Sequence, residues 1–517
     1  MSRSFFGPSS SRRQFIGGAL SIGAATAAAS GLSGCKDTTD MEWNEEADVI
    51  IVGAGGSGLT AAIEALRAGS SVILFEKALE AGGSTALSGG VIQAAGTDVQ
   101  IGGGVTNDTP DKHYDYYEQA GEGVPTPELL RTLTDNAPAA VTFMQGLGLA
   151  YSGVYGVDPI PTVDPSVMID RIHLIGEAVA GVGADHVAVL LAEVNALGGD
   201  LRTEAAVEGL VEDFDEGIVG VTVTIGGQIL NVRARQAVVI ASGGFERNED
   251  LVLAFSPQQK WEMETGVCYC APTNTGDGLV MGMNVGADVA ALGGTIGYPG
   301  VGIGTSTTVP GIWVNKHGQR FINEGGHYAY LMRGVYDQEE HMAWAVFDKT
   351  VGDIGGAAIG GFGGWSDDLS EEIASGQIIT AATLEDLATA LGVNASELER
   401  TVASWNDDMA DGTDKLFGKA VGLAMLNTAP YYAIQVTSIN LGTCGGLKIN
   451  TDTQVLDVYG QPIKRLYAAG MTTGGFIGPY YPGSGTAIAA TVVFGRIAGT
   501  NAANEVALEP VKNLVEA

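Results

Sequence analysis

Three glycines and one acid near the start of the chain have the spacing of a pyrophosphate-binding turn. Gly53, Gly55 and Gly58 follow an apolar run, and Glu76 ends the next apolar run about 20 residues further on. The first glycine permits a tight turn, the second lets the backbone approach a pyrophosphate, and the third lets a helix pack close to a strand. The helix start adds free N–H groups for the phosphates, and the acid accepts hydrogen bonds from a ribose. These residues predict a dinucleotide site.

The residues that follow Glu76 favour FAD over NAD as the dinucleotide. They are small or carry hydroxyl groups, which suits a chain that runs along the ribityl chain and isoalloxazine ring. The alternative is the Gly-rich loop of a plain NAD domain. The further residues expected to bind FAD are Lys77, Gly83, Ser84, Thr85, Ser88, Gly89, Gly90, Val207, Ser242, Gly243, Asn274, Gly276, Asp277, Gly470, Thr486 and Ile488.

The composition excludes some classes of partner. The chain has 60 acidic and 26 basic residues, a net charge of -34, which argues against nucleic acid and anionic lipid surfaces as partners. Besides Cys35 there are Cys268, Cys270 and Cys444, whose spacing matches neither a zinc nor an iron–sulfur site. We therefore expect buried thiols and no bound metal.

The N-terminal segment resembles an export signal. Residues 11–16 read SRRQFI, a twin-arginine pattern, and residues 32–35 read LSGC, which is similar to a lipobox ending at Cys35. This predicts a signal over 1–35, a linker over 36–46, and a lipid anchor on the outer face of the cytoplasmic membrane, or a periplasmic protein. The alternative is an ordinary signal peptide whose cysteine is incidental.

The elements that must position these residues alternate as in an α/β fold. Strand and helix patterns alternate over 47–283, change character over 284–440, and return over 441–517. We therefore expect a discontinuous Rossmann-type FAD-binding domain with an inserted α+β capping domain. Within the insert, Ser396 with Glu399 predicts a capping box at the start of a helix.

A series of motifs along the chain resembles one flavoprotein family. The motifs read GAGGSG, GGSTALSGG, ASGGF, NTGDG, NKHGQRFINE and DKLFG. Together they are similar to the family of fumarate reductases, urocanate reductases and 3-ketosteroid dehydrogenases. The resemblance covers most of the chain after Asp48, and it implies an FAD-dependent oxidoreductase that acts on CH–CH bonds.

Three positions separate the branches of that family. Fumarate-type enzymes have an arginine where this chain has Tyr328, a histidine at Gly442, and a second arginine at Tyr481. An arginine fork suits a carboxylate, and a tyrosine does not replace it. The resemblance therefore implies the 3-ketosteroid dehydrogenase type of active site and argues against fumarate and urocanate as substrates.

The same resemblance implies roles for these residues. Tyr481 and the N–H of Gly485 would hold a carbonyl oxygen, and Tyr328 would exchange a proton with the substrate. The neighbouring Tyr480 leaves the register of Tyr481 open by one. Further residues expected near the substrate are Tyr151 or Tyr155, Tyr298 and Gly442.

The direction of the reaction rests on the predicted export. An exported flavoprotein more often reduces its substrate, so we expect hydride transfer from flavin to the C=C bond of an enone, such as a steroid-like enone. The sequence has no second dinucleotide motif and no haem motif. Electrons would therefore come from a separate membrane quinol- or cytochrome-linked partner. The alternatives are a 3-ketosteroid dehydrogenase working oxidatively, and a fumarate- or urocanate-reductase-like enzyme with an altered substrate.

Overall fold

The computed structural model describes most of the chain after residue 40. The described residues are 41–176, 181–265, 267–299, 311–352, 366, 369–478, 481–512 and 514–515. The predicted signal with Cys35, and Tyr480, lie outside the described residues.

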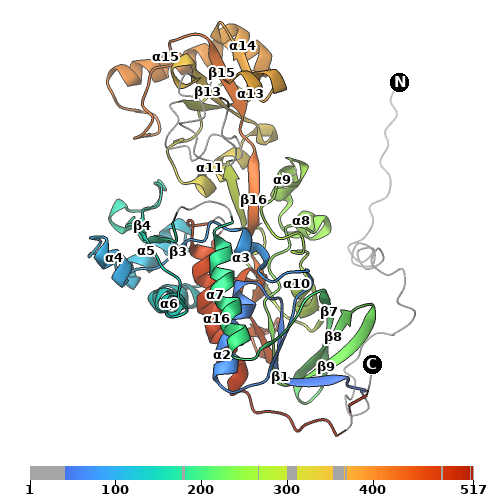
Figure 1. Cartoon of the computed structure of the whole chain (residues 1–517). Coiled ribbons are helices and arrows are strands. Elements are labelled where there is room, and N and C mark those ends of the chain that lie inside the picture. The colour runs from blue at the N-terminus through green and yellow to red at the C-terminus, as the bar shows by residue number, and fades with distance from the viewer. Residues whose placement is uncertain are drawn as a thin grey trace, which may run out of the picture.

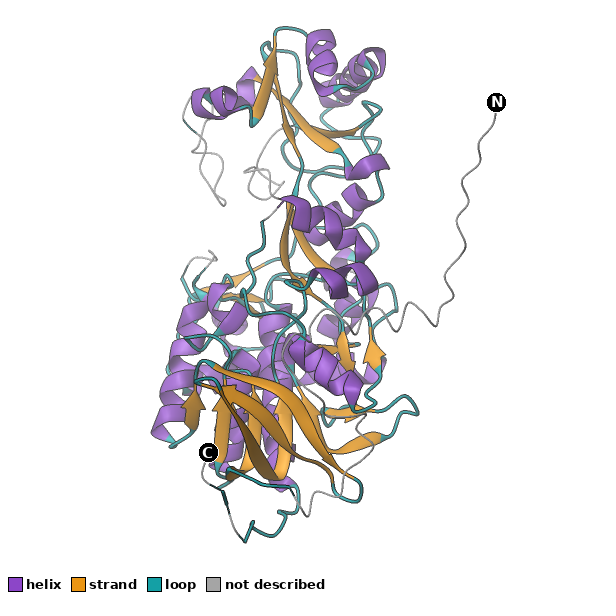
Figure 2. Cartoon of the chain, turned by 90° about the vertical axis from the view of Figure 1, so that its right-hand side faces the viewer, coloured by secondary structure: helices purple, strands orange, loops and turns teal. Residues whose placement is uncertain are grey.

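A mixed sheet carries the predicted glycine turn at its centre. Its strands run in the order β18-β19-β9-β1-β2-β6, parallel from β19 to β6, and β7 and β8 continue from β9 as an antiparallel meander (Figure 2). Residues 49–52 of β1 are all buried, as expected for a central parallel strand. The bounds are β1 Glu45–Val52, β2 Val72–Phe75, β6 Asp200–Arg202, β7 Ala205–Asp213, β8 Gly217–Ile225, β9 Gln228–Ile240, β18 Gln454–Leu456 and β19 Pro462–Ala468.

Helices α2 (Gly56–Arg67), α7 (Gly183–Ala196) and α16 (Thr486–Asn504) lie side by side against this sheet (Figure 1). Small residues let α2 and α16 approach closely, because a Cβ added at Gly499 would lie 2.1 Å from the carbonyl oxygen of Ala61. This packing holds the N-terminal ends of both helices at the same edge of the sheet. Among the described residues, no helix combines the length and apolar character needed to cross a bilayer.

A second, antiparallel sheet in the order β12-β13-β15-β14 lies at the far end of the molecule (Figure 1). Successive side chains of β12 point to opposite faces of this sheet and pack in two different cores. Ile312 and Val314 pack with the helical pair α14 and α15, whereas Trp313 packs with α11. The bounds are β12 Ile312–Asn315, β13 Ala343–Asp348, β14 Ile378–Ala381, β15 Tyr431–Gln435, α11 Tyr328–Tyr336, α12 Lys349–Gly352, α13 Ser370–Ser375, α14 Leu384–Leu391 and α15 Ala395–Ala410.

Two antiparallel strands, β11 (Thr295–Pro299) and β16 (Ser438–Thr443), lie between the two sheets (Figure 1). The expected mixed α/β fold is confirmed, while the domain boundaries at 284 and 440 stay predictions. The remaining elements are α3 Gly83–Leu87, β3 Ile92–Gln93, α4 Asp98–Gly102, α5 Pro110–Ala120, α6 Pro127–Gly146, β4 Gly153–Tyr155, β5 Ile172–Leu174, α8 Glu249–Phe255, α9 Lys260–Thr265, α10 Asp277–Asn284, β10 Val289–Ala290, β17 Gly446–Lys448 and β20 Thr473–Gly474.

The predicted capping box was wrong by two residues. Helix α15 begins at Ala395, and the side chain of Asn394 accepts a hydrogen bond from the N–H of Glu397. Ser396 lies inside the helix, and its hydroxyl donates to Asn394. Asparagine is as good an N-cap as serine, so the sequence alone did not distinguish the two starts.

Candidate active site

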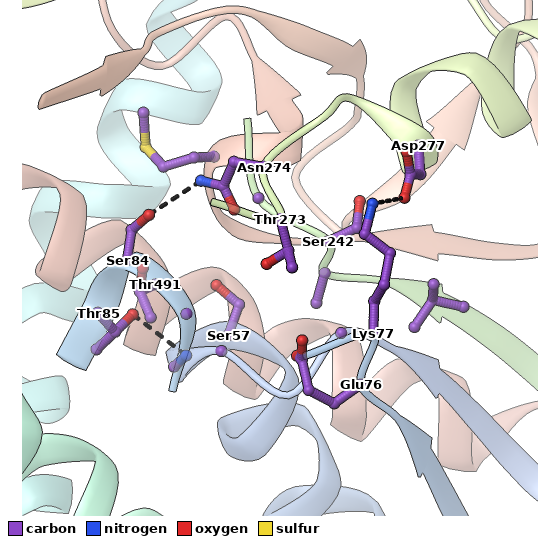
Figure 3. A pocket seen from close by; sticks show the side chains of 18 of the residues that line it. Ser57, Glu76, Lys77, Ser84, Thr85, Ser242, Thr273, Asn274, Asp277 and Thr491 are labelled. Carbon is purple, nitrogen blue, oxygen red and sulfur yellow. Dashed lines mark hydrogen bonds and ion pairs between the residues drawn. The ribbon is translucent and has the colours of Figure 1, made fainter. Parts of the chain in front are cut away.

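A cavity of about 110 Å³ lies at the end of β1, where the chain turns into α2. Figure 3 shows its polar side chains, which come from the turn, from the end of β2, and from later helices and loops. Because this is the carboxyl edge of the parallel strands, it is the expected place for a dinucleotide. The predicted residues that line it are Gly53, Gly55, Glu76, Lys77, Gly83, Ser84, Thr85, Val207, Ser242, Gly243, Asn274, Asp277 and Gly442.

The turn itself depends on a glycine that lies just behind the cavity. A Cβ added at Gly58 would lie 1.9 Å from the carbonyl oxygen of Gly53. The N-cap of α2 is Gly55, which offers no side chain to satisfy the first N–H groups of the helix. Those groups can therefore bind an anionic ligand.

Glu76 links the end of β2 to the glycine turn that follows β1. Its two carboxylate oxygens accept hydrogen bonds from Ala54 N at 2.9 Å and Ala78 N at 2.8 Å. Each oxygen retains a further lone pair for a ribose hydroxyl. Nearby, Lys77 Nζ forms an ion pair with Asp277 at 2.7 Å, which joins β2 to the start of α10 (Figure 3).

A hydrogen-bonded network closes the other side of the first cavity. Asn274 Nδ2 donates to Ser84 Oγ at 2.9 Å and to Glu246 Oε1 at 2.7 Å, and Thr443 Oγ1 donates to Glu246 at 3.2 Å. Glu246 was not predicted, although it directly follows the ASGGF motif. The other lining residues that sequence reasoning missed include Ser57, Ala205, Ala241, Thr273, Leu441, Ala469, Met471 and Thr491.

The donor set of the first cavity fits FAD. The cavity offers a helix N-terminus without a capping side chain, an acid at the end of β2, and hydroxyl groups along the path to a second cavity. Of the residues predicted to bind FAD, Gly58, Gly276, Gly470 and Thr486 do not line either cavity. Thr486, for example, is buried and donates to Gly483 O at 2.8 Å. These four residues shape the walls.

A second, larger cavity of about 310 Å³ adjoins the first. Ser84, Thr85 and Thr491 line both, so the two form one continuous path. Its lining is mainly apolar and aromatic. The predicted residues that line it are Ser88, Gly89, Gly90, Tyr155, Tyr298, Tyr328, Tyr481, Gly485 and Ile488.

Tyr328 lies at the centre of an aromatic group in the second cavity. It is the first residue of α11, and its ring centroid lies 5.1 Å from that of Tyr298 and 6.4 Å from that of Tyr481. Its hydroxyl accepts a hydrogen bond from Ser484 Oγ at 3.3 Å. Burial raises the pKa of the Tyr328 phenol well above its usual range, so it is a proton donor at neutral pH.

Tyr481 and Gly485 place two donors beside Tyr328. The hydroxyl of Tyr481 accepts a hydrogen bond from Ala487 N at 2.7 Å, which leaves its own hydrogen for a ligand. Gly485 is the N-cap of α16 with a φ of 92°, and none of the described residues accepts a hydrogen bond from its N–H. A Cβ there would lie 2.8 Å from Gln93 N, so only glycine fits. The pair can bind an oxyanion.

Two ionisable residues complete the second cavity. Burial lowers the pKa of His327 to about 3, which keeps the imidazole neutral. Burial raises the pKa of the Asp158 carboxyl to about 6. Asp158, Ser484 and Tyr269 also line this cavity and were not predicted to do so. Asp158 and Ser484 lie three residues from Tyr155 and Tyr481, but no motif in the sequence marked them.

Two of the residues expected near the substrate lie elsewhere. Tyr151 does not line the second cavity; its ring packs against His173 at 5.6 Å, so of the two candidates Tyr155 is the one beside Tyr328. Gly442 lines the first cavity rather than the second. A Cβ there would point towards Ile296 at 3.6 Å.

The RFINE and DKLFG motifs meet in a buried ion network that positions α11. Arg320 donates to Glu324 at 2.9 and 2.7 Å and to Asp414 at 3.0 and 2.9 Å. Glu324 Oε1 also accepts from Trp313 N at 2.9 Å. Because Glu324 lies one helical turn before Tyr328, this network holds the start of α11 at the cavity.

Comparisons with known proteins agree with this geometry. The family model described as "FAD binding domain" matches residues 48–488. The NADH:fumarate oxidoreductase of Klebsiella pneumoniae is 30% identical over 465 residues, which are 88% of this chain and 47% of that protein. The chain therefore spans about half the length of that relative.

Two further matches span nearly the full length of both proteins. The digoxin reductase of Eggerthella lenta is 28% identical over 555 residues, covering 96% of this chain and 97% of that protein. The crystal structure of a 3-ketosteroid-Δ4-(5α)-dehydrogenase from Rhodococcus jostii, in complex with 4-androstene-3,17-dione, matches with a TM-score of 0.79 and 26% identity over 92% of this chain and all of that chain.

The family match, the relatives and the fit of the first cavity together identify the cofactor as FAD. The chain belongs to the FAD-binding flavoprotein family of the fumarate reductases and 3-ketosteroid dehydrogenases, and it is an FAD-dependent oxidoreductase that acts on carbon–carbon bonds.

Proposed function

We propose that the protein reduces the C=C bond of a neutral α,β-unsaturated carbonyl compound, an enone. The observation that carries this proposal is the charge of the second cavity. Its described lining includes five tyrosines and one carboxyl group, and contains neither lysine nor arginine. A dicarboxylate such as fumarate would have no cation to balance its charge there, whereas a ketone would have phenol donors.

The chain's own residues supply binding and proton transfer. FAD supplies hydride chemistry when bound. The hydroxyl of Tyr481 and the N–H of Gly485 would donate to the carbonyl oxygen, a role in which one donor contributes about 3–4 kcal/mol. Tyr328 would give its phenolic proton to the carbon next to the carbonyl. The apolar lining would keep water away from both steps.

The oxidative direction is the second candidate. It is favoured by the similarity to the 3-ketosteroid-Δ4-(5α)-dehydrogenase, whose structure holds a steroid enone. In that direction Tyr328 would accept the proton that it donates during reduction. We propose reduction because the N-terminal segment resembles an export signal, and an exported flavoprotein more often reduces its substrate. The electrons would come from a separate partner, quinol- or cytochrome-linked.

The test is a single-turnover experiment on the purified yellow protein. The protein is photoreduced without air and mixed with a panel that includes cyclohexenone, androstenedione, fumarate and urocanate. We expect enones to restore the oxidised flavin spectrum and both acids to leave it bleached. Reoxidation by fumarate but not by enones would overturn the proposal. Bleaching of the oxidised enzyme by a saturated ketosteroid would support the oxidative candidate.

We also propose that the protein is exported and anchored through Cys35. The support is the twin-arginine and lipobox-like sequence within residues 1–35. Cell fractionation of the wild type and the Cys35→Ala variant tests this. The wild type should fractionate with membranes and the variant should be released, and a cytoplasmic wild type would contradict export.

A further inference from the structure

Asp158 is an acid that faces the second cavity without a partner. It forms neither a hydrogen bond nor an ion pair with any described residue. Burial raises the pKa of the Tyr155 phenol, and the nearby charge of Asp158 adds to that rise. Burial alone accounts for the raised pKa of Asp158 itself. In its ionised form the carboxyl group accepts hydrogen bonds only.

Asp158 is a half-buried carboxyl group without a protein partner. Withdrawing part of a charge from water without a hydrogen-bond partner destabilises the fold, and the described lining of this cavity supplies no cation to compensate. By contrast, the buried acids of the ion network, Glu324 and Asp414, are fully paired with Arg320. Asp158 is therefore a hydrogen-bond acceptor whose missing donor a ligand can supply.

His327 provides a second unpaired polar group in the same cavity. Its backbone N–H donates to Pro159 O at 2.9 Å, which ties the loop of Asp158 to the start of α11. Its Nδ1 accepts from Ala329 N at 3.3 Å, so the ring hydrogen is on Nε2. This side chain is 2% exposed, and its Nε2 has no partner among the described residues.

We propose that Asp158 is the site where the enzyme recognises an O–H or N–H group of its substrate, remote from the reacting carbonyl. His327 Nε2 would donate to a further acceptor of the same ligand. This inference rests on the proposed function and narrows it, because the preferred substrates are then enones that carry a hydroxyl or amino group. Tyr481 and Gly485 would bind the carbonyl oxygen, and Asp158 would select substrates that carry the hydroxyl or amino group.

The test compares binding of matched enones to the FAD-loaded enzyme. One pair is cyclohexenone and hydroxycyclohexenone; the other is androstenedione and testosterone, which carries a hydroxyl in place of the second ketone. Calorimetry and the shift of the flavin absorbance give the dissociation constants without turnover. A hydrogen bond to a charged acceptor leads us to expect tighter binding of the hydroxylated member of at least one pair, by about tenfold or more.

The variants are Asp158→Leu, the milder Asp158→Asn, and Asp115→Leu as control, since Asp115 is exposed on α5 away from both cavities. The control should keep the wild-type preference, the Asn variant should weaken it, and the Leu variant should lose it. Bound FAD and the melting temperature show that each variant is folded.

Several outcomes would overturn the inference. Equal binding of both members of each pair by the wild type would do so, and so would a preference that survives in Asp158→Leu. If Asp158→Leu lost turnover equally for both members of a pair and kept the binding preference, Asp158 would supply a proton rather than recognise the second group of the substrate. If no enone binds or reoxidises any of these proteins, the proposed function itself fails, which is a distinct result.

Discussion

Replacing Tyr328 by Phe removes the proposed proton donor and little else. The side chain is 7% exposed, and its hydroxyl accepts a hydrogen bond from Ser484 Oγ at 3.3 Å. Phe fills the same volume, so the fold and FAD binding should be retained. We expect the rate of enone reduction to fall about 10³-fold, which corresponds to about 4 kcal/mol in the barrier.

The magnitude follows from what remains in the cavity. General acids usually contribute 10²- to 10⁴-fold. Ser484 lies next to the lost hydroxyl, but its aliphatic alcohol is a weaker acid than a phenol. Tyr481 already accepts from Ala487 N and would donate to the carbonyl oxygen. Neither is therefore placed to replace the donor fully. Because burial raises the pKa of Tyr328, the wild-type rate should not fall up to about pH 9 from titration of this group.

The assay is anaerobic stopped-flow reoxidation of the reduced enzyme by an enone, in water and in deuterium oxide. The matched control is Tyr330→Phe, because Tyr330 is on the same helix, two residues on, and does not line either cavity. The Tyr328→Phe variant should also change the solvent isotope effect. A rate within threefold of both the wild type and the control would refute the assigned proton transfer.

Three further predictions concern FAD, the ion network and pH. Gly58→Ala should yield protein without bound FAD, since the new Cβ would lie 1.9 Å from a backbone oxygen. In the control Gly102→Ala the new Cβ would meet open space, so this variant should keep the flavin absorbance. Arg320→Met should lower the stability by about 3–5 kcal/mol because it removes the guanidinium that bonds two buried acids, leaving Glu324 with only the longer ion pair to Lys419. Arg400→Met at an exposed pair should cost under about 0.5 kcal/mol. Thermal melting compares the two variants, and similar melting would contradict the role of the network. Burial raises the pKa of Glu262 from 4.5 to about 7. The protonated carboxyl group therefore contributes to the stability of the fold fully below pH 4.5, and this contribution is lost as the pH rises through 7. The melting temperature should fall more between pH 5 and 8 in the wild type than in Glu262→Gln, and equal falls would contradict this prediction.

The FAD-binding turn was predictable because its parts are close in sequence. The strand, the glycines and the helix lie within residues 45–67, and Glu76 ends the next strand. The spacing of these residues along the chain was therefore enough to predict most of the geometry of the turn. The residues that were missed in the first cavity, such as Glu246 in a loop and Thr443 at the end of β16, come from later segments that the fold brings to the same edge.

The substrate cavity was less predictable because distant segments build it. Tyr328 and Tyr481 were found through a family resemblance, not through spacing. Asp158 belongs to a loop with no motif, and its position depends on the hydrogen bond between Pro159 and His327. A contact between residues so far apart in sequence leaves no local pattern. The exact start of α15 was also missed, since Asn394 and Ser396 are equally good caps.

The continuity of the two cavities has an evolutionary consequence. The wall shared by Ser84, Thr85 and Thr491 faces the cofactor path, whereas Tyr328 and Asp158 lie on segments that do not line the first cavity. Mutations at the latter positions can therefore accumulate in a duplicated gene while the flavoprotein still assembles. Such a scaffold can acquire new electron acceptors in small steps, each of which leaves a functional redox centre for selection to act on.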